Sequence, residues 1–256
     1  MLRLKGEGVC GGVVRGHVNF KGDAQSSSQG ASMRPMAISV DHLSNIVFVF
    51  GGAPTPEEMN ELFREGGGLL SQNAFVLEQC TYSLARLLSE NGSSGVAGIP
   101  PDYFKSGDVV VVNGREGTVE MEGVCAREVV SCLVQSEGKT LILKRSESVG
   151  SWQGKWASVS GYIEEGETPT DTAFKEIREE LSVESPNLVR KGRPVVTRKE
   201  GIVWISHPFL FALSPSEREI RIDWEHTDFR WVTLDELPSF DTVPGLGRTL
   251  SALGLV

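Results

Sequence analysis

One stretch of the chain, residues 168–183, carries apolar side chains at a clear helical period. Thr168 can cap its first turn, Pro169 suits the first helical position, and Asp171 complements the positive end of the helix dipole. The apolar residues recur at spacings of one, three and four, which places them on one buried face: Ala173, Phe174, Ile177 and Leu181. We therefore predict an amphipathic helix in this stretch.

Short apolar runs bounded by glycine, asparagine or aspartate predict β-strands in much of the remaining chain. We expect a hairpin across residues 107–121, with Asn113 and Gly114 at or near its turn. Thr55 and Glu58 have the spacing of a capping box at the start of a helix. Further strands are expected at residues 45–50, 128–134, 140–144, 201–213 and 219–222, and further helices at about 71–89 and 246–255.

The length of the chain and the order of these elements suggest two domains. A chain of 256 residues can hold two ordinary domains, each long enough to bury its own core. Residues 122–127 fit a short linker, so the expected domains are residues 1–124 and 125–256. We expect the α/β fold class.

Charge and cysteine usage narrow the class of protein. The net charge is −9 and there is no basic run, which argues against a surface dedicated to duplex nucleic acid or to a membrane. The four cysteines are scattered and form no CxxC pair, which favours a reduced protein with buried thiols over a disulfide framework or a zinc site. No apolar run approaches ~20 residues and the N-terminus lacks an apolar signal core, so we expect a cytoplasmic protein.

The predicted helix at 168–183 carries three carboxylates that share a face. Glu176, Glu179 and Glu180 fall at i, i+3 and i+4, and their repulsion weakens the helix by roughly a few tenths of a kcal/mol per pair. A hard divalent cation removes that penalty, and Mg²⁺ favours such oxygen ligands together with substrate phosphates. The alternative is a solvated acidic face, because charge runs are usually exposed.

The residues before this helix favour the metal-binding interpretation. The order Gly161, five residues, Glu167, seven residues, then Lys175-Glu176-Ile177-x-Glu179-Glu180-x-Ser182-Val183 resembles the signature of the Nudix hydrolases. Two positions depart from it, since the family has an arginine at Lys175 and a glycine at Ser182. Lysine keeps the charge but loses the bidentate fork, and serine loses the easy left-handed turn. Neither change removes a ligand.

The resemblance implies an α/β/α sandwich with a mixed sheet for residues 125–256, and a Mg²⁺-dependent hydrolase in which Mn²⁺ can substitute. The metal ligands that it implies are Glu176, Glu179, Glu180 and the carbonyl oxygen of Gly161. It also implies that Glu167 pairs with Lys175 and orders the loop against the helix rather than touching the metal.

Further site residues are implied outside the helix. Arg145 ends a strand where Nudix relatives often have an arginine facing substrate phosphates, although a surface arginine is equally open. Glu225 lies in a loop that often supplies a further ligand or base, so Glu225 or Glu179 would accept the proton of the attacking water. The alternative for Glu225 is a solvated loop residue. Trp152 and Trp156 precede the signature and serve either packing or nucleobase stacking.

The N-terminal half resembles a different family over about residues 4–122. Its glycine-rich opening, the strand leading to Thr55-Pro56, the stretch 67–71 and the hairpin are similar to the swivelling β/β/α phosphohistidine domain of phosphoenolpyruvate-utilising enzymes. That family's histidine is Gln72 here, and glutamine has no titratable ring nitrogen to carry a phosphoryl group. We expect a non-catalytic scaffold for docking, dimerisation or shaping the neighbouring site.

Together these features predict hydrolysis of a diphosphate linkage in a small nucleoside diphosphate derivative, with a homodimer left open. The alternative is a non-catalytic nucleotide sensor that uses the N-terminal domain for partner docking. All three helix glutamates are present, which favours catalysis. The isopentenyl diphosphate isomerase branch of the superfamily is disfavoured, because no cysteine lies in a strand run resembling that branch's catalytic motif. The sequence carries no marker that identifies the substrate.

Overall fold

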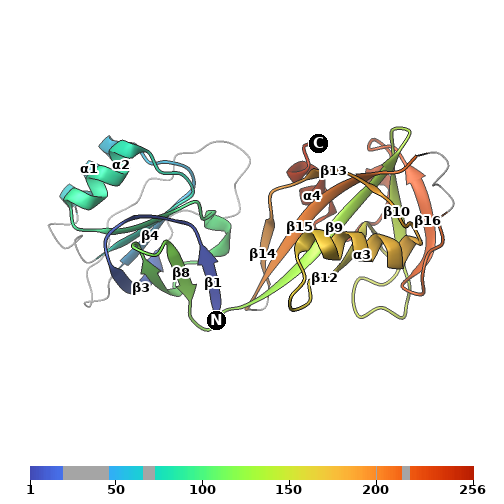
Figure 1. The fold of residues 1–256 in the computed structure, drawn as a ribbon, viewed down its shortest axis with the longest axis horizontal. Coiled ribbons are helices and arrows are strands. Elements are labelled where there is room, and N and C mark those ends of the chain that lie inside the picture. Colours follow the sequence, from blue (N-terminus) through green and yellow to red (C-terminus); the bar gives the residue numbers. More distant parts are fainter. Residues whose placement is uncertain (20–45, 66–72, 200, 215–219) are drawn as a thin grey trace. The chain divides into compact units, whose positions relative to one another are not determined.

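A computed structural model describes residues 1–19, 46–65, 73–199, 201–214 and 220–256 (Figure 1). The chain divides into two compact units. The first comprises Met1–Ala126 with Glu200–Ile202, and the second comprises Arg127–Lys199 with Val203–Val256. Each unit has its own sheet and its own hydrophobic core among the described residues.

The first unit is built on an eight-stranded sheet in the order β1-β8-β7-β3-β4-β5-β6-β2. Strands β3 to β6 pair in parallel, and the other pairs are antiparallel, including the expected hairpin of β7 with β8. Its elements are β1 (Leu2–Lys5), β2 (Glu7–Cys10), β3 (Val13–Asn19), β4 (Ile46–Phe50), α1 (Pro56–Glu65), β5 (Ala74–Leu77), α2 (Tyr82–Glu90), β6 (Ser94–Ala97), η2 (Pro101–Tyr103), β7 (Val109–Asn113) and β8 (Thr118–Met121).

Helix α1 begins where the capping box predicts it. Thr55 Oγ1 accepts from the backbone N–H of Glu58, and the Glu58 carboxylate accepts from the N–H of Thr55, at 3.2 and 2.8 Å. These bonds satisfy two of the donors that a helix leaves free at its start. Met59 and Leu62 are buried from this helix against Phe75 of β5, so α1 closes one core of the unit.

The prediction of a single helix at about 71–89 is wrong for the first half of that range. Residues Ala74–Leu77 form β5, a buried strand between β4 and β6, and helix α2 begins only at Tyr82 with Thr81 as its cap. A parallel strand covered on both faces is a continuous apolar run, and periodicity cannot separate that from a buried helical segment. Gln72 and the glycine run 66–68 lie outside the described residues.

The second unit is built on a sheet in the order β11-β10-β9-β15-β13, to which β12, β14 and β16 add through β9, β15 and β10. Its elements are β9 (Cys125–Ser136), β10 (Lys139–Arg145), β11 (Trp156–Ala157), β12 (Val159–Tyr162), α3 (Pro169–Leu181), β13 (Asn187–Lys191), β14 (Val195–Lys199), β15 (Ile202–Ala212), β16 (His226–Val232), η4 (Leu237–Ser239) and α4 (Leu246–Ala252).

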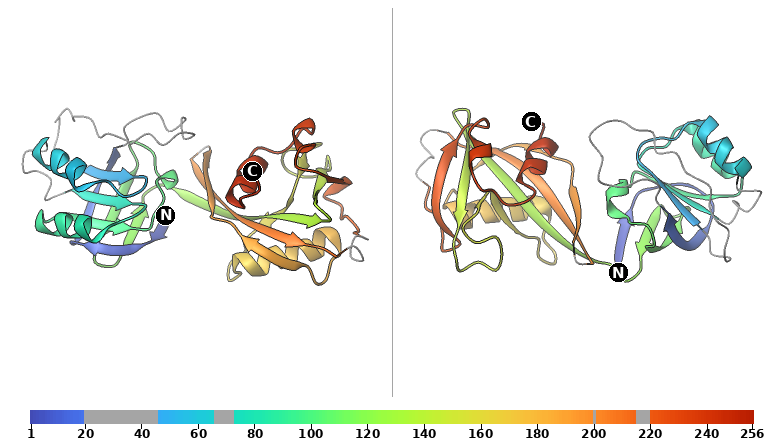
Figure 2. Two further views of the ribbon diagram at one scale, coloured as in Figure 1. Left: turned by 90° about the horizontal axis from the view of Figure 1, so that it is seen from above. Right: turned by 180° about the vertical axis from the view of Figure 1, so that it is seen from behind.

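Helices α3 and α4 pack on opposite faces of this sheet (Figure 2). Alternate residues of one strand divide between the two cores, since Leu141 and Leu143 of β10 pack in the cluster of α3 and Ile142 packs in that of α4. Side chains of a strand point to opposite faces in turn, which explains the division. The second unit is therefore a three-layer α/β arrangement.

Helix α3 confirms the prediction for residues 168–183. The Thr168 hydroxyl accepts from the Asp171 N–H in a capping box, and Ala173, Ile177 and Leu181 are fully buried. The helix ends at Ser182, whose φ of 57° and ψ of 35° are left-handed. The departure from glycine at this position thus falls on a backbone conformation that costs an L-residue energy.

Two smaller expectations need correction. Within the described residues, Ile220 to Ile222 form no strand, because this segment runs along the end of α3 and the Arg221 N–H bonds to the carbonyl of Leu181 instead. The expected linker at 122–127 is also shorter than predicted, since β9 already begins at Cys125. The four cysteines are free, but the expected burial of their thiols is wrong for Cys125, which is exposed, whereas Cys132 is buried and Cys10 and Cys80 are partly buried. No helix in the described part of the chain is long and apolar enough to cross a membrane.

Candidate active site

Helix α3 presents its three glutamates at different depths. Glu180 is only 3% exposed, Glu176 is partly buried, and Glu179 is exposed at the surface. Glu176 directly precedes the fully buried Ile177, and its carboxylate lies over Gly161 at the border between the helix and the sheet. The acidic face predicted from the sequence is thus only partly solvated, and it turns two carboxylates towards β12.

Only one of the two carboxylate oxygens of Glu180 accepts a hydrogen bond within the described residues. Its Oε1 accepts from the backbone N–H of Ser160 on β12 at 3.1 Å. Its Oε2 is buried and has no hydrogen-bond partner among the described residues. Burial raises the pKa of this carboxyl well above its usual value, and the charges of Glu176, Asp223 and Glu225 act in the same direction.

Gly161 of β12 lies directly beneath the carboxylate of Glu176. A Cβ atom at this position would overlap that carboxylate, so any other residue here would displace the Glu176 side chain. Burial and the charge of Glu179 raise the pKa of Glu176 to about 7, with Glu225 and Glu167 contributing in the same sense and Lys175 opposing them. Lys175 thus only partly offsets the effects of burial and of the neighbouring carboxylates on Glu176.

Strand β16 brings Glu225 and Arg145 to the same site. Arg145 at the end of β10 is registered against His226, and the Ser146 N–H donates to the carbonyl of Glu225 at 2.7 Å. Burial raises the pKa of Glu225, Asp223 adds to that rise, and Arg145 lowers it. The opposing effect of Arg145 shows that its guanidinium lies near the Glu225 carboxylate. Arg145 and Glu225, two predicted site residues that are far apart in the sequence, are therefore neighbours.

Asp223 and His226 are site residues that sequence reasoning missed. The Nδ1 atom of His226 lies 3.1 Å from Oδ1 of Asp223, and its Nε2 lies 3.6 Å from Oε2 of Glu180. The His226 side chain is 1% exposed, and its Nε2 has no hydrogen-bond partner in the described residues. Burial lowers the pKa of His226, while Asp223 opposes that shift.

The pair of Glu167 and Lys175 is formed as expected. Lys175 Nζ donates to Glu167 Oε1 at 2.8 Å, and Glu167 Oε2 accepts from the Thr172 hydroxyl at 2.8 Å. These bonds lower the pKa of Glu167 and raise that of Lys175. Lys175 also lies 3.8 Å from Glu164, so it joins the loop 163–168 to the first turns of α3.

The two tryptophans occupy different environments. Trp156 is 9% exposed in the core beneath α4 and stacks edge-on against Phe240, with ring centroids 5.3 Å apart. This placement fits the packing interpretation. Trp152 is 42% exposed in the loop after β10, and Lys199 Nζ lies 5.5 Å from its ring centroid. Trp152 is thus the more accessible of the two rings.

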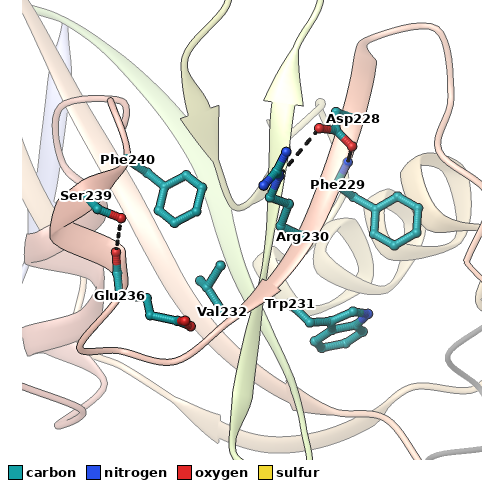
Figure 3. A pocket seen from close by; sticks show the side chains of 8 residues that line it. All are labelled: Asp228, Phe229, Arg230, Trp231, Val232, Glu236, Ser239 and Phe240. Carbon is teal, nitrogen blue, oxygen red and sulfur yellow. Dashed lines mark hydrogen bonds and ion pairs between the residues drawn. The ribbon is translucent and has the colours of Figure 1, made fainter.

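A shallow groove of about 550 Å³ is lined by residues of β16 and of the segment that follows it (Figure 3). Arg230 spans its centre, where it pairs with Asp228 at 3.6 Å and lies over the Trp156 ring. The side chains that line it are Asp228, Phe229, Arg230, Trp231, Val232, Glu236, Ser239 and Phe240. None of the helix glutamates contributes to this groove.

Comparison with known families agrees with this arrangement. The family model described as NUDIX domain matches residues 126–253, which is half of the chain. The chain belongs to the Nudix family. The matched residues include the whole α3 region and the loop with Glu225.

Similar Nudix proteins cover the same half. The nucleoside triphosphatase NudI of Escherichia fergusonii is 33% identical over 140 residues, covering 51% of this chain and 98% of that protein. NudI of Escherichia coli is 30% identical over the same length. A MutT protein from Methanosarcina mazei aligns at 22% identity and a TM-score of 0.42, over 49% of this chain and 89% of its own.

The residues of this Nudix unit fit a divalent cation in chemistry but are not already arranged as a ligand cage. Within the described ranges, no three His, Cys, Asp or Glu side chains form a group that could hold a metal ion as they stand. The donors are nevertheless carboxylates that repel one another, and Glu180 Oε2 is a buried oxygen without a partner among the described residues. Hard oxygen donors of this kind suit Mg²⁺.

Proposed function

We propose that the Nudix unit hydrolyses a diphosphate linkage in a nucleoside diphosphate derivative, with Mg²⁺ as its cofactor. The observation that carries this proposal is the convergence of acidic groups from α3 and from the loop before β16. Glu176, Glu180 and Glu225 each have a raised pKa, with burial the largest cause and neighbouring carboxylates adding to it. A cation at this place would relieve both penalties.

The residues that would hold the cation are Glu176, Glu179, Glu180 and the carbonyl oxygen of Gly161. When bound, Mg²⁺ would neutralise substrate oxygens and lower the pKa of a coordinated water, and Mn²⁺ can substitute for it. The pair of Glu167 and Lys175 orders the loop next to these ligands and does not join them. Lys175 in place of arginine keeps that ion pair at 2.8 Å.

Glu225 is the side chain that we assign to accept the proton of the attacking water. Its pKa is raised, which brings a carboxylate closer to the neutral pH at which a general base is most effective. Glu179 remains the alternative base, although its place among the proposed ligands favours a metal-binding role. Arg145, next to Glu225, would contact the substrate phosphates, and its planar guanidinium suits that recognition.

Trp152 is the proposed stacking surface for the base or another aromatic part of the substrate. Its ring is exposed in the loop that follows Arg145, whereas Trp156 is committed to the core. The relatives named nucleoside triphosphatase suggest a nucleoside triphosphate as the first substrate to test. Such a molecule is itself a nucleoside diphosphate linked to a further phosphate.

For the N-terminal unit we retain the proposal of a swivelling-type scaffold without phosphotransfer, which serves docking or dimerisation. Its parallel strands β3, β4, β5 and β6, with α1 between β4 and β5 and α2 between β5 and β6, are compatible with that family. Gln72 instead of histidine is the sequence feature behind the proposed loss of phosphotransfer.

The test is a substrate panel of nucleoside triphosphates, nucleotide sugars and dinucleotides, with release of phosphate products measured in Mg²⁺ and in chelator. We expect Mg²⁺-dependent turnover of at least one member by the wild type, and loss of it in Glu180→Gln. Glu184→Gln is the matched control. The Glu184 side chain is 77% exposed, and its ion pair with Arg178, at 3.1 Å, involves none of the proposed ligands. Tight nucleotide binding without turnover of any member would favour the sensor instead.

A further inference from the structure

The side chains of Asp223, His226 and Glu180 form a row that ends at the proposed metal ligands. Asp223 lies beside Nδ1 of His226 at 3.1 Å, and Nε2 of His226 faces Oε2 of Glu180 at 3.6 Å. The side chains of His226 and Glu180 are 1% and 4% exposed, while Asp223 at 22% reaches the border of solvent. The row runs from the loop before β16 to the last turn of α3.

Both facing atoms lack any other partner in the part of the chain that the structure describes. Glu180 Oε2 and His226 Nε2 are the two buried side-chain atoms there without a hydrogen bond. Buried polar atoms are nearly always satisfied, so two unsatisfied atoms that point at each other need an explanation. A small closing movement would join them, since 3.6 Å is only slightly longer than a hydrogen bond.

The surroundings argue against the simplest structural explanation, which is a salt bridge that merely stabilises the fold. Buried ion pairs are weak contributors to stability unless their remaining atoms are well bonded. Here neither facing atom has a hydrogen bond among the described residues, and the side chain of Asp223 is 22% exposed. The row is therefore poorly suited to stabilising the fold. Its last member, Glu180, is one of the proposed metal ligands.

We infer that His226, held by Asp223, is a positioning residue that fixes the Glu180 carboxylate for the divalent cation. The inference rests on the proposed function, because it assigns Glu180 as a ligand. Glu180 Oε1 accepts from the Ser160 N–H at 3.1 Å. With Asp223 accepting from Nδ1–H, the second anchor is a proton carried by His226 Nε2, which donates to Oε2 of the ionised Glu180 once the 3.6 Å gap closes. A carboxylate has about four acceptor positions, so both anchors leave sites for a cation. Asp223 sets the orientation of the ring.

The test measures Mn²⁺ binding to the metal-free full chain by electron paramagnetic resonance and calorimetry. Partners behind metal ligands typically change metal affinity by about 10–100-fold, so His226→Gln should weaken Mn²⁺ binding within that range. Asp223→Asn should weaken it less, since the ring stays in place but loses its orienting carboxylate. Both variants are to be checked by circular dichroism and thermal melting.

His207→Gln is the matched control. His207 makes the same type of contact in the same unit, with its Nε2 2.7 Å from Oε2 of Glu128. This contact does not involve the glutamates of α3. We expect His207→Gln to bind Mn²⁺ like the wild type. Removal of a histidine–carboxylate contact in general is thereby separated from removal of this particular one.

Two further readouts separate positioning from a general structural role. The Mn²⁺ concentration needed for half-maximal activity should rise in His226→Gln, while activity at saturating Mn²⁺ recovers most of the wild-type value. In a Glu180→Gln background, His226→Gln should change Mn²⁺ affinity less than twofold, because a residue that acts through Glu180 has nothing left to position.

Normal Mn²⁺ affinity in His226→Gln, with or without a lower melting temperature, would overturn the inference. The same holds if the effects of Glu180→Gln and His226→Gln on Mn²⁺ affinity are additive. Failure of the proposed function gives a different result, in which the wild type itself binds no Mn²⁺ and turns over no substrate.

Discussion

At the scale of single residues, Glu176 shows most directly what the site does to its own side chains. Its pKa of about 7 in the metal-free protein means that the folded state holds the proton more tightly than the unfolded chain does. The sign follows from that difference. Stability from this group is complete below the ordinary carboxyl pKa and is lost as pH rises through about 7.

Glu176→Gln should therefore stabilise the metal-free protein at pH 8 and have little effect at pH 5. The gain at pH 8 should be on the order of 1–3 kcal/mol, reduced from the full shift because the carboxyl is partly solvated. Chemical denaturation at the two pH values in chelator measures it. Glu184→Gln, at an exposed position, should show no such dependence. An equal change in stability at both pH values would contradict the assignment.

Glu225→Gln tests the general base. The substitution keeps the shape of the side chain but removes its proton acceptor, so kcat should fall by about 10²–10⁴-fold with little change in substrate KM. Glu179→Gln should instead raise the Mg²⁺ concentration needed for activity. Steady-state kinetics over a series of Mg²⁺ concentrations distinguishes the two variants. The reverse pattern would exchange the roles of Glu179 and Glu225.

The sequence predicts the residues of the candidate site that follow one another at fixed spacing, and the family resemblance adds Arg145 and Glu225, but Asp223 and His226 are missed. The glutamates of α3, Gly161 and the pair of Glu167 with Lys175 all belong to one continuous motif. Asp223 and His226 meet Glu180 only because β16 pairs with β10 beside the end of α3. An Asp and a His three residues apart are too common in loops to signal that meeting.

At the scale of an element, the end of α3 carries a measurable cost. Ser182 adopts a left-handed conformation, which costs a residue with a Cβ atom about 1–2 kcal/mol, whereas glycine adopts it freely. Part of that gain is offset by the larger freedom of glycine in the unfolded chain. Ser182→Gly should raise the free energy of unfolding by about 0.5–1 kcal/mol.

Ser182→Ala is the matched control for this change. Alanine keeps the strained backbone and removes the serine hydroxyl, which lies 3.4 Å from the carbonyl oxygen of Arg221. Equilibrium unfolding in denaturant should therefore order the three proteins with glycine the most stable. If the glycine and alanine variants unfold at the same denaturant concentration, the backbone at 182 is not strained.

Most of the apolar runs were correctly predicted as strands, such as the run at 45–50 that forms β4. Helix α3 has two agreeing signals, a capping box and a helical period, and the structure confirms it. Strand β5 has only an apolar run, so it was taken for helix. The segment at 220–222 alternates like a strand, yet it packs against α3 with no neighbour to pair with among the described strands.

At the scale of the whole molecule, the separate cores of the two units predict two unfolding transitions. Each unit buries its own large apolar side chains, such as Phe75 in the first and Phe211 in the second. Domains with separate cores need not unfold together. Calorimetry of the full chain should show two transitions, and Ser182→Gly should shift only one of them. A single transition that shifts as a whole would contradict this division.

The central claim is that the acidic face of α3 holds the cation against a diphosphate substrate. The most direct measurement is a crystal structure of the full chain grown with Mn²⁺ and a non-hydrolysable nucleoside triphosphate, with anomalous scattering recorded for manganese. The account predicts a manganese peak in contact with carboxylate oxygens of Glu176, Glu179 and Glu180 and with the nucleotide phosphates. A nucleotide bound with no manganese at these carboxylates, or a peak elsewhere, would contradict it.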